Sequence, residues 1–323
     1  MKKLMLVLFI GLNSISAIAQ QFQNPTQLFD KWLAILETPL VSAKSEAAAV
    51  DNLLAVSQSR IAAFNLQALG RTFSSINPEF SQIRFEFKKI EDGLGKIDKW
   101  SKQGLEKKAT EAKREFAVVL KSEKWFGAKS KIITIRKRIQ NLAQNLDKPE
   151  TTILKHLADA LTEIYNTPFD FSGLESINGL HEYRREIRWF MIETRMLEGM
   201  VSFKPDQTAC PNPAVFELFK NKKTESTNIS DLLKPIQSSK YSQLAAAKPG
   251  QLTCPVSACL FYALSDTVEK IGNIKDDVEN QFGESGDDTT PEVYKKKAEK
   301  VFDKVNQTDA FNLLAAELLQ CAQ

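Results

Sequence analysis

Residues 78–94 read PEFSQIRFEFKKIEDGL, and their apolar side chains recur at every third or fourth position. These side chains are Phe80, Ile83, Phe87, Ile90 and Leu94. On an α-helix this spacing brings side chains to one face, so the segment predicts an amphipathic helix that Pro78 opens. Gly93 and Gly95 weaken the helical pattern, and we expect a bend or the end of the helix there.

Similar patterns continue along the chain in both directions. They predict helices over 25–36, 45–73, 99–120, 129–146, 150–165, 175–201, 255–282, 291–305 and 309–321. The 323 residues contain only 13 Gly and 12 Pro, and no useful stretch alternates with a period of two. An all-β fold needs more frequent turns, so the sequence predicts an all-α fold. The Pro-rich stretch 202–253 interrupts the long helices as an irregular insertion with short helices.

The first residues have the pattern of a secretory signal peptide. Lys2 and Lys3 precede an apolar run over 4–12, and the small-residue sequence Ala17-Ile18-Ala19 follows. The run is about half of the roughly 20 residues that a membrane-spanning helix needs. We therefore expect cleavage after residue 19 and a mature chain, without a transmembrane segment, that is periplasmic or secreted.

All four cysteines lie in the last third of the chain: Cys210, Cys254, Cys259 and Cys321. An even number in an exported chain predicts two disulfides, with Cys210 bonded to Cys254 or Cys259 and Cys321 bonded to the other. Free or partly paired thiols are the alternative. A zinc site fits poorly because zinc sites need paired short spacings, and we expect no metal.

Charge is unevenly distributed. The whole chain has 43 Lys and Arg against 40 Asp and Glu, a net charge of +3 that argues against a nucleic-acid partner. Residues 84–138 nevertheless carry 17 basic and 8 acidic side chains, and residues 266–288 carry 8 acidic and 2 basic ones. Lys107, Arg114 and Lys121 are spaced by seven and share a helix face. This face is either a solvated surface or a concave surface for a polyanion.

The most specific candidate site lies in residues 180–190, LHEYRREIRWF. His181, Arg184 and Arg188 share one helix face, and Arg195 continues the row. Cations in a row repel one another unless an anion lies against them, and arginine forks suit phosphate oxygens. The alternative is that nearby acids such as Glu182 and Glu186 neutralise the row. The other histidine, His156, has no such neighbours and is expected at the surface or at its boundary.

The pattern H-x-x-R-x-x-x-R on a helix resembles the signature of the CHAD domain, an α-helical, His-containing domain that binds inorganic polyphosphate. Residues 271–278, IGNIKDDV, resemble the family's apolar-Gly-x-x-x-Asp segment, and 94–100, LGKIDKW, resemble a weaker copy. Aligning Gly95 with Gly272 suggests an internal duplication. The resemblance covers most of 45–282. In the first half only Arg60 and Arg71 match the cations, no His is present, and Met191 stands where a further cation is expected.

This resemblance implies two pseudo-symmetric antiparallel helical bundles with a Cys- and Pro-containing insertion. We therefore expect four segments along the chain. Residues 1–19 form the signal peptide and 20–44 an N-terminal helix or linker. Residues 45–165 form a first, basic bundle, and 166–323 form a second bundle with its insertion at 202–253. A basic cleft between the bundles would be lined by His181, Arg184 and Arg188.

Enzyme signatures are absent from the sequence, including G-x-S-x-G, H-E-x-x-H and a phosphate-binding loop. We therefore expect no catalytic residues and no cofactor. Two hypotheses remain. The first is an exported module that binds polyphosphate or another polyanion; the second is a structural or partner-binding helical protein of the cell envelope. The first needs Arg184, Arg188 and the cations of 84–138 to converge on one cleft, whereas the second leaves them scattered or ion-paired.

Overall fold

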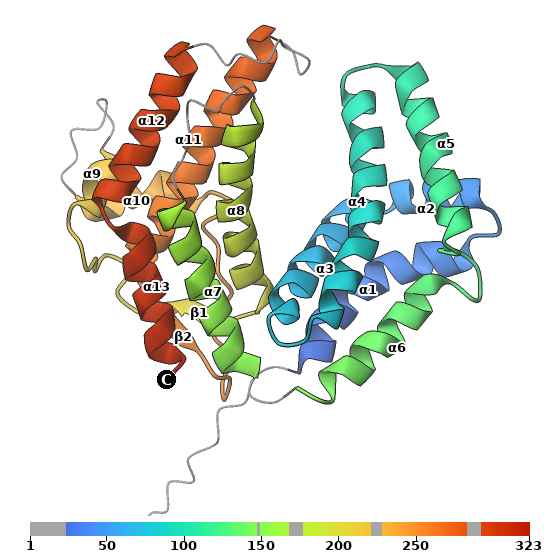
Figure 1. Ribbon diagram of the computed structural model, residues 1–323, viewed down its shortest axis with the longest axis horizontal. Helices are drawn as coiled ribbons and strands as arrows, with labels where there is room; N and C mark the ends of the chain where they lie inside the picture. Colours follow the sequence, from blue (N-terminus) through green and yellow to red (C-terminus); the bar gives the residue numbers. More distant parts are fainter. Residues whose placement is uncertain (1–23, 147–148, 168–176, 221–227, 283–291) are drawn as a thin grey trace, which may run out of the picture.

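The computed structural model describes residues 24–146, 149–167, 177–220, 228–282 and 292–323. Secondary structure in these ranges is almost entirely helical, which confirms the all-α prediction. The helices form two halves that lie side by side, one from α1 to α6 and the other from α7 to α13 (Figure 1). The predicted signal peptide, 1–19, lies outside the described residues.

The first half consists of six helices. They are α1 (Pro25–Ser42), α2 (Glu46–Ala55), α3 (Ser59–Ser74), α4 (Glu79–Lys102), α5 (Glu106–Ser122) and α6 (Lys131–Ala143). Helix α3 packs against α1 and α4, and α5 packs against α2 and α4. Phe29, Phe73 and Phe80 form the aromatic centre of this half, with ring centroids 5.5 to 5.7 Å apart. Helix α1 is therefore part of the first half and not a linker.

Two predicted helices of the first half have different limits in the structure. The single helix expected over 45–73 is divided into α2 and α3, because Val56 leaves the helical conformation (φ −94°, ψ 103°). A β-branched residue followed by Ser57 favours such a break, since a short polar side chain competes for backbone hydrogen bonds. The helix expected to begin at residue 99 begins at Glu106, after a turn at Gly104 (φ +69°).

The sequence predicts a bend or the end of the helix at Gly93 and Gly95, but the helix does not end there, because α4 continues through both glycines to Lys102. The glycines serve helix packing instead. A Cβ atom at Gly93 would overlap the ring of Phe116 on α5, and one at Gly95 would lie 2.9 Å from Nη2 of Arg60 on α3. The absence of a side chain lets these two neighbours approach the α4 backbone.

The second half contains the remaining elements of the described chain. They are α7 (Pro149–Asn166), α8 (Ile177–Met196), β1 (Val201–Phe203), α9 (Val215–Phe219), α10 (Ile229–Gln237), β2 (Cys254–Val256), α11 (Ala258–Phe282), α12 (Glu292–Gln307) and α13 (Ala310–Cys321). Helix α7 packs on α13 and α8. The sequence predicts that these residues belong to the first bundle. Their packing places them in the second half, so the halves divide between α6 and α7 and not near residue 165.

Both predicted disulfides are present within this half. Cys210 is bonded to Cys259 at the start of α11, and Cys254 on β2 is bonded to Cys321 at the end of α13. Together they attach the insertion 202–253 to two helices of the core. A short parallel pair, β1 with β2, brings the two ends of the insertion together. The period-two criterion missed it because each strand has only three residues.

The two halves meet mainly along α3 and α8 (Figure 1). Phe64 of α3 stacks on Trp189 of α8 with ring centroids 4.6 Å apart and an interplanar angle of 10°. Among the residues described, no helix combines the length and the hydropathy required to cross a membrane.

Candidate anion-binding site

Helix α8 carries the row of cations that the sequence singled out. Arg184, Arg188 and Arg195 have described side chains, all of them partly buried. The side chain of His181 lies outside the described residues, so its role stays a prediction. Met191, at the position where a further cation was expected, is buried in the core. The row therefore presents three arginines, each with different surroundings.

Arg188 lies where α8 faces the first half. Its guanidinium carbon is 5.8 Å from the ring centroids of both Phe64 on α3 and Tyr241 in the insertion. Its Nε is buried and has no hydrogen-bond partner. Burial lowers the pKa of Arg188, and the positive charges of Arg184 and Arg60 lower it further, although Tyr241 and Glu91 act in the opposite direction. Arg188 is thus an enclosed cation beside two other cations.

Arg184 lies one helical turn before Arg188 and packs against α11. Its Nε donates a hydrogen bond to the carbonyl oxygen of Val268 at 3.2 Å. Its guanidinium covers Gly272, where an added Cβ would lie 2.7 Å from Nη2. No carboxylate of the described residues forms an ion pair with Arg184, so its charge is balanced only at longer range.

Arg60 completes the group from the first half. Its guanidinium covers Gly95 as that of Arg184 covers Gly272. Unlike Arg184, it forms ion pairs with two carboxylates of α4, Glu91 at 2.9 Å and Asp98 at 3.1 Å. We call Arg60, Arg184 and Arg188 the arginine cluster. Glu91 is the acid that acts electrostatically on both Arg60 and Arg188.

Arg71 belongs to a different group of charges between the halves. It donates to Glu186 at 2.6 Å and pairs with Glu193 at 2.8 Å. Glu193 is only 2% exposed, and His156 on α7 and Thr72 on α3 also contact its carboxylate, at 3.1 and 3.2 Å. These carboxylates raise the pKa of Arg71 although burial opposes them. Arg71 therefore has no free hydrogen-bonding capacity of the kind that Arg188 has, and His156 lies at a boundary, as expected.

Arg195 lines another hollow, of about 500 Å³, between α1, α3 and α8. Its Nη1 donates to the carbonyl oxygen of Lys240 at 3.3 Å, and burial lowers its pKa. Glu198 on the same wall pairs with Lys31 at 2.9 Å and with Lys248 at 3.2 Å. Arg195 thus lines a hollow with Lys31, Glu198 and Lys248, although it shares Tyr241 as a neighbour with Arg188.

The cations of 84–138 do not converge on the arginine cluster. Lys107, Arg114 and Lys121 lie on α5, which packs on α2 and α4, and Lys121 pairs with Glu46 at 3.0 Å. Other cations of the segment also have carboxylate partners: Lys88, Lys89, Lys96, Lys102, Lys113, Lys131, Arg136 and Arg138. Most of this segment is therefore neutralised locally by acids from α1, α2, α4 and α5.

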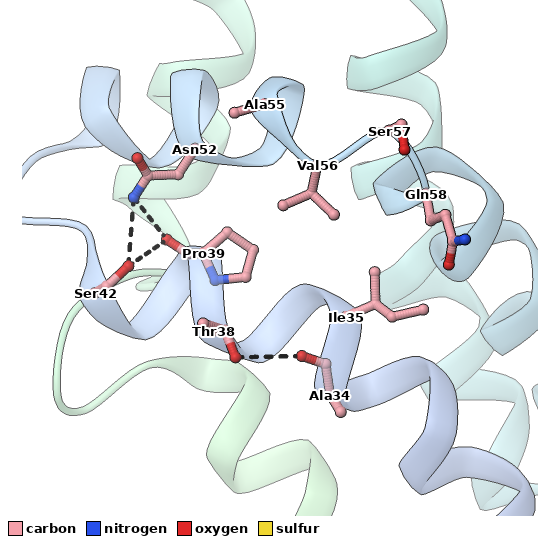
Figure 2. A pocket seen from close by; sticks show the side chains of 10 residues that line it. All are labelled: Ala34, Ile35, Thr38, Pro39, Ser42, Asn52, Ala55, Val56, Ser57 and Gln58. Carbon is pink, nitrogen blue, oxygen red and sulfur yellow. Dashed lines mark hydrogen bonds between the residues drawn. The ribbon is translucent and has the colours of Figure 1, made fainter.

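A hollow of about 580 Å³ lies between α1 and α2 (Figure 2). Its lining carries no charged side chain. Asn52 closes one side by donating to the carbonyl oxygen of Pro39 at 3.0 Å and to Ser42 Oγ at 3.4 Å. Nothing in this hollow attracts an anion. Within the described residues, no group of three or more His, Cys, Asp or Glu side chains is arranged to hold a metal ion.

Comparison of the chain with protein-family models, with curated protein sequences and with solved structures gave no match. Its functional interpretation therefore rests on its own residues. Sequence reasoning found Arg60, Arg184 and Arg188 but missed Phe64, Tyr241 and Glu91. Tyr241 lies in the irregular insertion, where no periodic pattern predicts which way a side chain points. Phe64 and Glu91 lie on regular helices, but only the contact between the halves brings them to Arg188.

Proposed function

We propose that this chain is an exported, non-catalytic protein that binds a phosphate-rich anion, such as polyphosphate, at the arginine cluster. One observation carries the proposal: Arg188 is an enclosed guanidinium whose Nε has no hydrogen-bond partner. An unsatisfied buried donor costs about 1–3 kcal/mol, and more when it belongs to a charged group. An anion bound at the cluster removes that cost.

Chemistry favours phosphate oxygens as the acceptors. A guanidinium offers donors in a fixed planar fork that matches two oxygens of one phosphate group. Arg184 on the same helix and Arg60 in the other half both lie close enough to Arg188 for their charges to lower its pKa. The rings of Phe64 and Tyr241 flank Arg188, which limits its rotamers before a ligand arrives. His181 begins the same helical row and would add a charge at acidic pH.

We further propose that the chain is a divergent member of the CHAD family. The support is a contact that recurs in both halves: an arginine of α3 or α8 covers a glycine of α4 or α11. These glycines are the two that the internal duplication aligns, Gly95 and Gly272. Arg71 and Arg195 follow Arg60 and Arg184 at the same sequence distance. The duplication accounts for both observations.

The second hypothesis, a structural or partner-binding helical protein, also has an observation in its favour. Most cations of 84–138 are ion-paired, as that hypothesis requires. The neutralised segment therefore adds no general attraction for polyanions. The two hypotheses differ at the arginine cluster alone, so the deciding experiment addresses that cluster.

The experiment measures binding of long-chain polyphosphate by the full mature chain. Replacement of Arg184→Ala and Arg188→Ala together should weaken binding at least roughly tenfold, because charged hydrogen bonds are each worth about 1.5–3 kcal/mol. Affinity of the unchanged protein should fall steeply with salt, by analogy with counterion release from nucleic acids. The double variant should keep its helical circular dichroism.

Lys107→Ala with Arg114→Ala provides the matched control. It also removes two positive charges, but from the exposed face of α5, where neither side chain has a carboxylate partner among the described residues. We expect less than a twofold change in affinity. Equal binding by a folded Arg184→Ala, Arg188→Ala variant, or no salt-sensitive binding by the unchanged chain, would reject the proposal and favour the structural protein.

Export is the remaining part of the proposal. Two disulfides in the described residues support an oxidising compartment. Sequencing of the N-terminus of exported protein should begin at Gln20, whereas a retained Met1 would contradict signal cleavage.

A further inference from the structure

A second group of cations lies in the second half, around a cavity between α11 and α12. The cavity has a volume of about 320 Å³ and opens next to Leu218 of α9. It shares no residue with the arginine cluster. Its volume is at the lower end of the roughly 300–1,000 Å³ that is typical of small-molecule sites.

The floor of the cavity is apolar. Ile274 of α11 and Val305 of α12 are buried there, and Val301 and Leu218 are partly buried. An apolar floor of this size favours an occupant that removes hydrocarbon surface from water. A bare inorganic anion gains nothing from it.

The rim, in contrast, is formed by four lysines. Lys297, Lys300 and Lys304 line the cavity from α12, where their spacing places them on one helix face. Lys270 lines it from α11. Like charges along one helix face repel one another, so an anion at the rim relieves an unfavourable arrangement.

Among the described residues that line the cavity, a carboxylate offsets only part of this charge. Asp266 is the one acid among the lining residues, and it is already paired with Lys270 at 2.5 Å. Lys270 also donates to the carbonyl oxygen of Leu218 at 3.1 Å, so it is held in place at the rim. Within the described residues, Lys300 and Lys304 make no hydrogen bond or ion pair. The rim thus carries four cations against one carboxylate.

We propose that this cavity binds a small amphiphilic anion, with a single carboxylate head at the rim lysines and an apolar body on the floor. Lysine suits such a head because its ammonium is a compact point charge. Unlike a guanidinium, it does not need to bind two oxygens of the anion at once. The site differs from the arginine cluster in both respects, having an apolar floor and lysines in place of arginines.

Calorimetric titration of the full mature chain with octanoate tests the proposal. Octanoate should bind at one site, whereas acetate, which has the head alone, and octanol, which has the apolar body alone, should each bind at least roughly tenfold more weakly. Equal affinity for octanol would show a merely apolar cavity, and equal affinity for acetate a merely basic surface. Either result overturns the proposal, as does the absence of saturable binding.

Variants locate the binding. Lys300→Gln with Lys304→Gln should weaken octanoate binding at least roughly tenfold, and Asn273→Trp should weaken it similarly by filling the cavity without changing its charge. Lys295→Gln with Lys296→Gln is the matched control, because it removes two charges from the same helix outside the cavity lining, and it should change affinity less than twofold. The Arg184→Ala, Arg188→Ala variant should bind octanoate unchanged. If the control weakens binding as much as Lys300→Gln with Lys304→Gln, the assigned site is wrong.

Discussion

Arg71 and Arg188 lie on facing helices and both are largely enclosed, yet their surroundings give them different roles. Arg71 meets two carboxylates, Glu186 and Glu193, which satisfy its donors and raise its pKa. Arg188 meets two aromatic rings and two other arginines, and its pKa is lowered chiefly by burial. A paired buried cation holds helices together, whereas an unpaired one retains attraction for an anion.

Glu123 allows a residue-scale prediction that depends on pH. It accepts from Lys89 at 2.7 Å and from Lys131 at 2.9 Å. Although burial opposes them, these two lysines lower its pKa from 4.5 to about 2. The ionised form therefore stabilises the fold fully above about pH 4.5, and this contribution is lost as the pH falls towards 2.

Glu123→Gln should consequently lower the free energy of unfolding at pH 7 by about 1–2 kcal/mol, less than the full shift implies because the group is partly solvated. Urea denaturation should show the difference from the unchanged chain shrinking between pH 4.5 and pH 2. Glu115→Gln, which breaks a more exposed pair with Lys96, should cost less than about 0.5 kcal/mol. A loss that stays constant with pH would contradict the proposed charge effect.

Two glycines test how closely helices pack at the scale of elements. Gly93→Ala should destabilise the protein by about 1 kcal/mol, because the gain in helix propensity is outweighed when the new methyl group displaces the buried ring of Phe116. Gly272→Ala meets only the end of the flexible Arg184 side chain, so unfolding should be unchanged or slightly less favourable. If the proposed function holds, the Gly272 variant should nevertheless bind polyphosphate more weakly. Thermal unfolding and a binding titration measure the two effects, and a stable Gly93→Ala protein would contradict the packing argument.

The contact between α3 and α8 gives a further prediction at this scale. Arg71→Ala leaves Glu193 buried without its guanidinium partner and should cost about 3 kcal/mol in urea denaturation. Adding Glu193→Gln should recover part of the loss, because a neutral amide tolerates burial better than a carboxylate. Arg185→Ala removes only an exposed pair with Glu182 and should cost less than about 0.5 kcal/mol. Equal effects of the two arginine variants would show that the halves do not depend on this contact.

The disulfides act at the scale of the whole molecule, because they close chain segments with sequence separations of 49 and 67 residues. Each should contribute about 4 kcal/mol if it acts by restricting the unfolded chain. Cys254→Ser with Cys321→Ser should therefore lower the midpoint of thermal unfolding and release the end of α13, which hydrogen exchange detects. Exchange in α4 and α5 should change little, since these helices lie in the half without cysteines. Uniformly faster exchange in both halves would contradict a local role.

The sequence by itself determined the helical fold class and the buried face of α4. Phe80, Ile83, Phe87, Ile90 and Leu94 are all buried on α4 as their spacing predicts, and the cysteines pair within the two arrangements that it allowed. Helical periodicity is a local property of the sequence, and four cysteines allow only a few pairings, so both can be predicted from the sequence.

Only the tertiary structure decided which charges remain available. Arg136 of the basic segment 84–138 is neutralised by Asp30 and Glu37 of α1, which are about 100 residues away in the sequence. Arg188 instead keeps an unsatisfied nitrogen, because Phe64 and Tyr241, distant in sequence, are the neighbours that packing brings to it. Gly93 likewise fits an uninterrupted helix because Phe116 occupies the space of its missing side chain. Electrostatic energy and steric fit depend on distances between elements, and those distances exist only once the helices have packed.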